Sequence, residues 1–156
     1  MDETAKTMKG FAEKGYFCAQ IMVAMGLHHQ GQSNPELLRA MEGFKGGFAF
    51  AGKTCGALTG AIGLLGLYAG RGAADEPPNP LLDRMVLDLV DWFEEYVGKK
   101  YGSIDCASVT QGQYNQETCS SCQVIVYLTY QKTAEILAAH GFELSGRPVQ
   151  VAAAGG

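Results

Sequence analysis

The residues of this chain that are best suited to chemical reaction or metal binding are its five cysteines. They fall in four separate segments, as Cys18, Cys55, Cys106 and the close pair Cys119 and Cys122. The N-terminal residues are charged and lack the apolar core of an export signal, so we expect a cytoplasmic protein. In a reducing compartment cysteines rarely form structural disulfides, and metal ligation or thiol redox chemistry become the leading explanations. The residues alone leave the choice between these two open.

The sequence context differs from one cysteine to the next. Cys18 falls within an expected helix on an apolar stripe, where a lone cysteine is typical of a packed core. Cys55 falls in the first turn of another expected helix, directly after a Lys-Thr pair. There we expect the helix dipole and the cation to lower its thiol pKa. Cys106 lies in an expected loop, where there is little reason to expect a cysteine that packs in the core. Cys119 and Cys122 form a CxxC pair at the start of a helix, a placement that favours reactive thiolates.

Two absences narrow the kind of site. Cys122 is followed by Gln123, so the CxxCH attachment of c-type haem is absent. No second CxxC occurs at zinc-ribbon spacing, which weakens a structural zinc interpretation. A single site would need the cysteine-bearing segments to converge, and a small helical bundle allows this.

Helical periodicity dominates the chain, and almost nothing alternates as a strand would. We expect a single all-α bundle over residues 1–145 and a flexible tail at 146–156. Gly26 is the expected left-handed cap of the first helix, and Gly141 that of the last. Residues 98–116 are an expected loop. The five expected helices cover about residues 3–25, 34–46, 54–68, 80–96 and 118–140.

The third expected helix belongs to an uncharged stretch, residues 54–70. It is short for a membrane span, which needs about 20 apolar residues, so a buried central helix is the better interpretation. Its glycines recur on one side and offer a smooth ridge to a neighbouring helix. Gly56 and Gly60 also leave room for a cofactor to approach the backbone near Cys55. The fourth helix is expected to turn one set of side chains inward, namely Met85, Leu89, Trp92, Phe93 and Tyr96.

The cysteine pattern resembles that of the redox-active proteins named for a C…GCAxxG…C…C motif. The resemblance extends from about Phe11 to Leu137 and is carried by Cys18, Cys55 in the segment TCGALTG, Cys106 and Cys122. The central motif is a close variant, CGALTG, and Cys119 is then an extra thiol. The resemblance implies an all-helical cytoplasmic protein with an iron–sulfur or thiol redox role. The implied redox-active residues or metal ligands are Cys18, Cys55, Cys106 and Cys122.

A second motif points to different chemistry. Residues 47–54 match the P-loop pattern GxxxxGK[ST], in which backbone amides cradle phosphates and Lys53 would reach the terminal phosphate. A P-loop follows a buried strand, and residues 41–46 do not read as one. Nucleotide binding is therefore the less favoured hypothesis, although the loop could bind an anion at the start of the third helix.

The histidines are weaker candidates. His28 and His29 lie just past the first expected helix and could bind a metal, but a solvated helix end is the favoured interpretation. His140 falls in the last turn of the last helix, where a cation complements the dipole. The acidic residues of the fourth helix read as its solvated face.

Charge and composition exclude several classes of partner. A net charge of −4 and an isoelectric point near 5.3 leave no basic surface for nucleic acid, and no Lys/Arg cluster suggests an anionic membrane. We expect a small redox-active protein that uses an iron–sulfur cluster, another thiophilic metal or a thiol–disulfide couple, and a redox partner protein. The alternative is a non-catalytic helical subunit whose cysteines serve packing. The oligomeric state, the metal and the substrate are not determined by the sequence.

Overall fold

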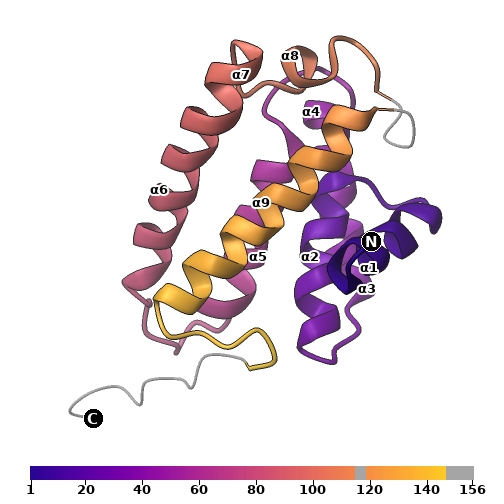
Figure 1. Ribbon diagram of the computed structural model, residues 1–156. Coiled ribbons are helices and arrows are strands. Elements are labelled where there is room, and N and C mark those ends of the chain that lie inside the picture. Colours follow the sequence, from indigo (N-terminus) through magenta and orange to yellow (C-terminus); the bar gives the residue numbers. More distant parts are fainter. Residues whose placement is uncertain (115–118, 147–156) are drawn as a thin grey trace.

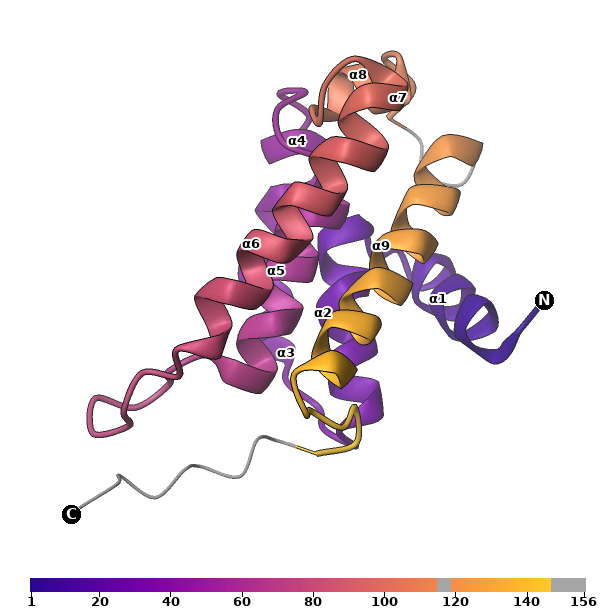
Figure 2. The same cartoon turned by 60° about the vertical axis from the view of Figure 1, so that its left-hand side comes forward.

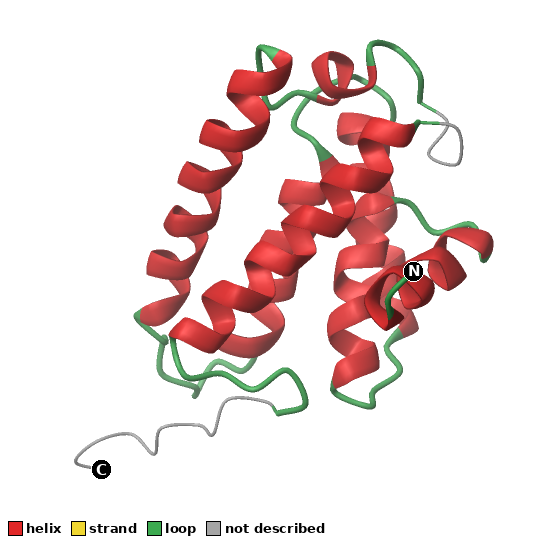
Figure 3. Cartoon of the chain, viewed as in Figure 1, coloured by secondary structure: helices red, strands yellow, loops and turns green. Residues whose placement is uncertain are grey.

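The chain folds into helices joined by turns and loops in the part that the computed structural model describes, residues 1–114 and 119–146. These residues form no strand, which confirms the all-α class (Figures 1 and 3). The α-helices are α1 (Glu3–Glu13), α2 (Cys18–His29), α3 (Pro35–Met41), α4 (Lys45–Phe48), α5 (Gly56–Ala69), α6 (Leu81–Phe93), α7 (Lys99–Tyr101), α8 (Cys106–Thr110) and α9 (Ser120–Ala139). A 3₁₀ turn (Glu42–Phe44) precedes α4, and a π-helical turn (Glu94–Gly98) joins α6 to α7.

The expected first helix is in fact two helices. α1 ends at Glu13, and Gly15 adopts a left-handed φ of +91° before α2 begins at Cys18. Glycine takes this conformation at little cost, so the chain turns there. The prediction that Gly26 caps the helix was wrong: α2 continues to His29, and Gly26 is buried against Leu64 of α5. As a result Cys18 lies at the start of a helix and not in the middle of one.

The glycine ridge of α5 brings α2 close, as predicted. A Cβ atom on Gly60 would lie 2.6 Å from the Cα of Ala19 in α2, too near for any side chain. The ridge ends before Gly66, where an added Cβ would meet nothing within 4 Å. α2 is the main neighbour of α5, and α6 and α9 cover its remaining sides. Figures 1 and 2 show α6 and α1 on opposite sides of the molecule.

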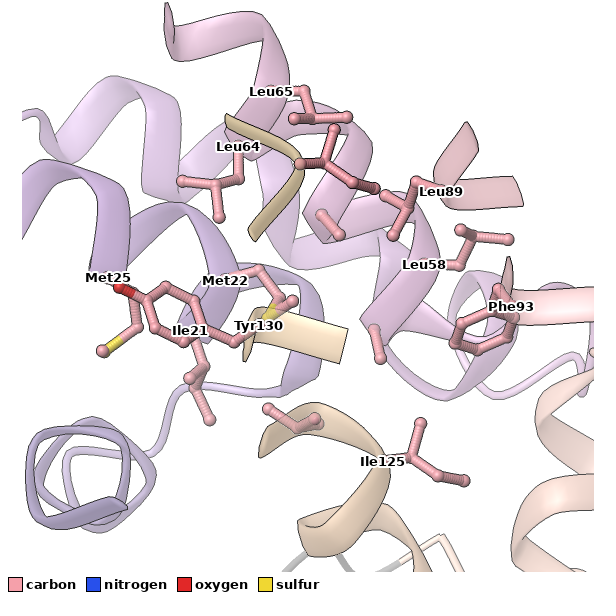
Figure 4. Close-up of a cluster of buried hydrophobic side chains, with 14 of the residues drawn as sticks. Ile21, Met22, Met25, Leu58, Leu64, Leu65, Leu89, Phe93, Ile125 and Tyr130 are labelled. Atoms are coloured by element: carbon pink, nitrogen blue, oxygen red, sulfur yellow. The ribbon is translucent and has the colours of Figure 1, made fainter. Parts of the chain in front are cut away.

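Apolar side chains from four helices meet in the core, as Figure 4 shows. The labelled residues are Ile21, Met22 and Met25 from α2, Leu58, Leu64 and Leu65 from α5, Leu89 and Phe93 from α6, and Ile125 and Tyr130 from α9. Met85, Leu89 and Phe93 are fully buried, as expected for α6. None of the helices in the described ranges is long and apolar enough to cross a membrane, which agrees with a buried α5.

The end of the fourth expected helix differs from the prediction. Tyr96 is 42% exposed and stacks on Trp92, whereas Val97 is fully buried. The π-helical turn explains the change, because its wider turn shifts the buried face by one residue.

The expected loop at 98–116 is partly helical. It contains the end of the π turn, α7 and α8, and Gly102 at a φ of +87° follows α7. The last expected helix is confirmed as α9, with Gly141 at a φ of +85° just beyond it. Residues 115–118 and the expected tail from 147 onward lie outside the described residues.

Candidate functional site

Four of the five cysteines line one small cavity. Cys18 is the first residue of α2, Cys55 immediately precedes α5, Cys106 is the first residue of α8, and Cys122 lies in the first turn of α9. These helix ends gather beside α4 at the upper end of the molecule in Figure 1. The cavity measures about 30 Å³, enough for an occupant about the size of a water molecule or a single ion. All five thiols are free.

Backbone pairing between two distant segments places Cys55 beside Cys106. The amide of Cys55 donates to the carbonyl of Ile104 at 3.0 Å, and the amide of Cys106 donates to the carbonyl of Lys53 at 2.6 Å. Thr54 and Asp105 complete an isolated bridge. These hydrogen bonds join backbone groups only, so the side chains of the two segments give no motif from which the contact could be predicted.

The segment before Cys55 does not form a phosphate cradle. The amides of residues 49–53 all donate to backbone carbonyls, most of them within the same loop. The amide of Gly52, for example, donates to Gly46 at 3.1 Å, and that of Lys53 donates to Gly47 at 3.0 Å. No strand precedes or follows the loop within the described residues. The sequence therefore matches the P-loop pattern, but the amides of residues 49–53 are already bonded within the protein and are not free to bind phosphate.

Gly56 and Gly60 have different surroundings. Gly56 lines the cavity, and a Cβ atom there would lie 2.3 Å from the sulfur of Cys18. The absence of a side chain at Gly56 therefore makes room for a thiol. Gly60 packs on the backbone of Ala19 and does not line the cavity, so its role in the structure is helix packing.

Cys119 and Cys122 form a close pair. Their sulfur atoms are 2.8 Å apart. Cys119 occupies the position just before α9 and is 3% exposed, whereas Cys122 is partly exposed and lines the cavity. Cys122 thus lines the cavity and also contacts a fifth thiol, Cys119, which does not line it.

Burial keeps the cavity thiols protonated. It raises the pKa of Cys18 to about 11 and that of Cys55 to about 12. Burial also raises the pKa of Cys106, and it raises that of Cys122 with a further contribution from the Cys119 thiol. The expected lowering at Cys55 was wrong, because desolvation outweighs the amides of Ala57 and Leu58 at the start of α5.

Three aromatic rings border the cavity, and sequence reasoning missed them. Phe17 and Tyr114 line it, and the ring of Phe50 contacts both, with centroids 5.7 and 5.8 Å away. Phe50 also covers Gly46, where a Cβ atom would lie 2.3 Å from the ring. Residues 48–50 adopt left-handed backbone conformations without being glycine, with φ between +50° and +67°. Such conformations cost energy and concentrate at functional sites.

The chemical type of the cavity side chains suits soft metals. Four cysteine thiols are ligands that zinc and iron–sulfur clusters accept. Within the described ranges, however, no three His, Cys, Asp or Glu side chains converge closely enough to hold a metal ion. The thiols would have to turn further into the cavity before a metal could bind to them all.

The three histidines lie away from this cavity. His29 stacks on Tyr130 at 6.1 Å, and burial lowers its pKa. His28 is exposed in the last turn of α2, not beyond the helix as predicted. The imidazole of His140 contacts the carbonyl of Ile136 at 2.8 Å.

The comparison with known families agrees with this geometry. Residues 16–136 match the family described as "Putative redox-active protein (C_GCAxxG_C_C)". The chain belongs to this family. The C_GCAxxG_C_C match spans all four cysteine-bearing segments and the helices that carry them. No curated protein and no solved structure matches the chain.

Proposed function

We propose that the protein transfers electrons by thiol–disulfide exchange, with Cys119 and Cys122 as the pair that cycles between dithiol and disulfide. The 2.8 Å separation of their sulfurs carries this proposal. Cys122 is the more exposed of the two, so it meets an incoming disulfide first. Cys119, buried behind it, is placed to resolve the mixed disulfide.

The exchange balances in two steps. The Cys122 thiolate attacks one sulfur of the partner's disulfide, the partner's S–S bond breaks, and one partner thiol leaves with a proton. The Cys119 thiolate then attacks the Cys122 sulfur, and the second partner thiol leaves with the second proton. The pair loses two electrons and becomes a disulfide, and the partner gains two electrons and two protons. The oxidant is a disulfide of a small molecule or of a redox partner protein, and a cytoplasmic setting would keep the resting pair reduced.

Thiol counting after mild oxidation tests the proposal. Treatment of the reduced protein with oxidised glutathione should lower the free thiols from five to three, because one pair is consumed. Cys119→Ser should keep all four of its thiols free of any internal disulfide. The matched variant Cys18→Ser should still lose two. A wild-type protein that keeps five thiols, or a Cys119→Ser protein that forms an internal disulfide as readily, would show that this pair is not the redox couple.

A second candidate rests on the convergence of Cys18, Cys55, Cys106 and Cys122 on one cavity. These residues would hold a single thiophilic metal ion, or, in a cavity larger than the present 30 Å³, an iron–sulfur cluster that would supply one-electron chemistry. Binding would release the thiol protons that burial now retains. Anaerobic purification followed by iron, sulfide and visible-absorption measurements separates the candidates. Stoichiometric iron and sulfide, lost in Cys18→Ser and kept in Cys119→Ser, would favour the cluster over the disulfide.

A further inference from the structure

A second, larger hollow lies between α1, α2 and α3. It measures about 600 Å³, which falls within the range of about 300–1,000 Å³ usual for small-molecule sites. None of the four cavity cysteines lines it. Gln20, which is 7% exposed, forms part of its floor and holds the neighbouring elements together. Its amide oxygen accepts from the Phe17 amide at 3.3 Å, and its nitrogen donates to the Leu38 carbonyl at 3.1 Å.

The charges that remain unpaired in this groove are positive. Lys14 and Arg39 both line it, and neither forms an ion pair with a carboxylate of the described residues. Glu42 is the one acidic residue in the lining, and Lys45 neutralises it at 3.6 Å. The whole chain has a net charge of −4, so a hollow with two cations that form no ion pair with the described residues is more positive than the average surface of the protein. Such a site favours an anion.

The groove also offers an apolar wall. Phe11, Tyr16, Leu27 and Leu38 all line it, and the ammonium of Lys14 lies 5.5 Å from the centre of the Phe11 ring. A ligand that places its charge at Lys14 and Arg39 would therefore rest its body on rings and methyl groups. An inorganic anion would contact only Lys14 and Arg39 and would leave the apolar wall unused.

From these features we infer that the groove binds a small organic anion, a carboxylate or sulfonate with an aromatic or branched apolar body. Lys14 and Arg39 hold the charged group, and Phe11, Tyr16 and Leu38 contact the body. The site is separate from the thiol chemistry proposed above, and its test does not depend on that chemistry.

Two fluorescent probes of nearly the same shape test the inference on the full chain. Anilinonaphthalene sulfonate carries the anionic group, and phenylnaphthylamine has the same rings without it. The sulfonate should bind the wild type about tenfold more tightly. Lys14→Ala/Arg39→Ala should abolish this preference. The control Lys6→Ala/Arg84→Ala removes the same charges from exposed positions outside the groove and should keep it. Equal binding of both probes by the wild type, or a preference that survives in Lys14→Ala/Arg39→Ala, would overturn the inference.

Backbone amide chemical shifts locate the bound sulfonate. Titration should perturb residues 11–20 and 34–39, on the two walls of the groove. Perturbations confined to the exposed rings of Phe48 and Phe50, or to any other surface, would also overturn it. Circular dichroism of each variant checks that the fold persists.

Discussion

At the scale of single residues, the notable property of the site is that its thiols are uncharged at rest. Cys18, Cys55, Cys106 and Cys122 all have pKa values raised by burial. A protonated thiol is a poor nucleophile, so exchange at Cys122 should accelerate as the pH rises. The cavity thiols are therefore poor nucleophiles at neutral pH.

The raised pKa values also make stability depend on pH. An unfolded cysteine loses its proton near pH 9.0, whereas Cys18 and Cys55 lose theirs near 11 and 12 in the folded protein. Above pH 9 the unfolded state binds fewer protons, so the free energy of unfolding falls as the pH rises. This stabilisation is fully present below pH 9 and is lost on the way to pH 12. Urea unfolding of the reduced, metal-free protein should show that fall, and Cys18→Ala/Cys55→Ala should show a shallower one. Parallel slopes would mean that these thiols are not desolvated.

At the scale of elements, the contact between α2 and α5 sets the position of two cavity thiols. Gly56 and Gly60 let the start of α2 approach the backbone of α5, which brings Cys18 next to Cys55. The loop at 46–55 then ties α5 to α8 through backbone hydrogen bonds. Each of these helices positions one cavity cysteine at its start, and the contacts between the helices bring the cysteines together around the cavity.

Two substitutions within α5 test this packing. Gly60→Ala should destabilise the protein by about 1–3 kcal/mol, because its Cβ meets the backbone of Ala19, which cannot rotate away. Gly66→Ala should stabilise it by roughly 0.5–1 kcal/mol, because its Cβ meets nothing and alanine favours the helix. Urea denaturation measures both. Equal effects would show that α2 and α5 are less closely packed than described.

The aromatic border of the cavity should limit access to the thiols. Phe50→Ala removes the ring that bridges Phe17 and Tyr114, and iodoacetamide should then modify the cavity thiols about three- to tenfold faster. Phe48→Ala is the matched control, since Phe48 is also 42% exposed and left-handed but its ring contacts Phe44. Similar rates in the two variants would argue against a role for Phe50 in covering the cavity.

At the scale of the molecule, long-range contacts hold the bundle closed around the core. The Tyr68 hydroxyl, at the end of α5, donates to the Leu144 carbonyl at 2.6 Å. At the other end of the chain, the Tyr127 hydroxyl of α9 donates to the Asp2 carboxylate, which also caps α1. These bonds attach both terminal segments to the helices that carry the cysteines.

Loss of the first of these bonds should be measurable. Tyr68→Phe leaves a carbonyl without its donor and should lower the free energy of unfolding by about 1–2 kcal/mol. Tyr96→Phe, at an exposed position, should change it by at most a few tenths. Chemical denaturation of both variants checks the difference. A Tyr68→Phe protein as stable as the wild type would show that the C-terminal segment is not held by this bond.

Much of this arrangement could be predicted from local features of the chain. The apolar periodicity of α6 specified most of its buried face, and the glycine spacing of α5 specified a close helix contact. The order and spacing of the cysteines were enough to indicate the family. Gly15 shows the limit: an isolated glycine fits a helix interior or a break, and tertiary contacts decide between them.

The amino-acid sequence by itself determined the helical class, the central place of α5 and the identity of the thiols. Only the tertiary structure decided that Cys18, Cys55, Cys106 and Cys122 share a cavity, and that burial raises the thiol pKa values. The reason is physical. Periodicity and capping act within a few residues, whereas the pairing of residues 52–55 with 104–107 uses backbone groups that every sequence has. Desolvation likewise depends on what surrounds a thiol after folding, and neighbours in the chain do not specify it.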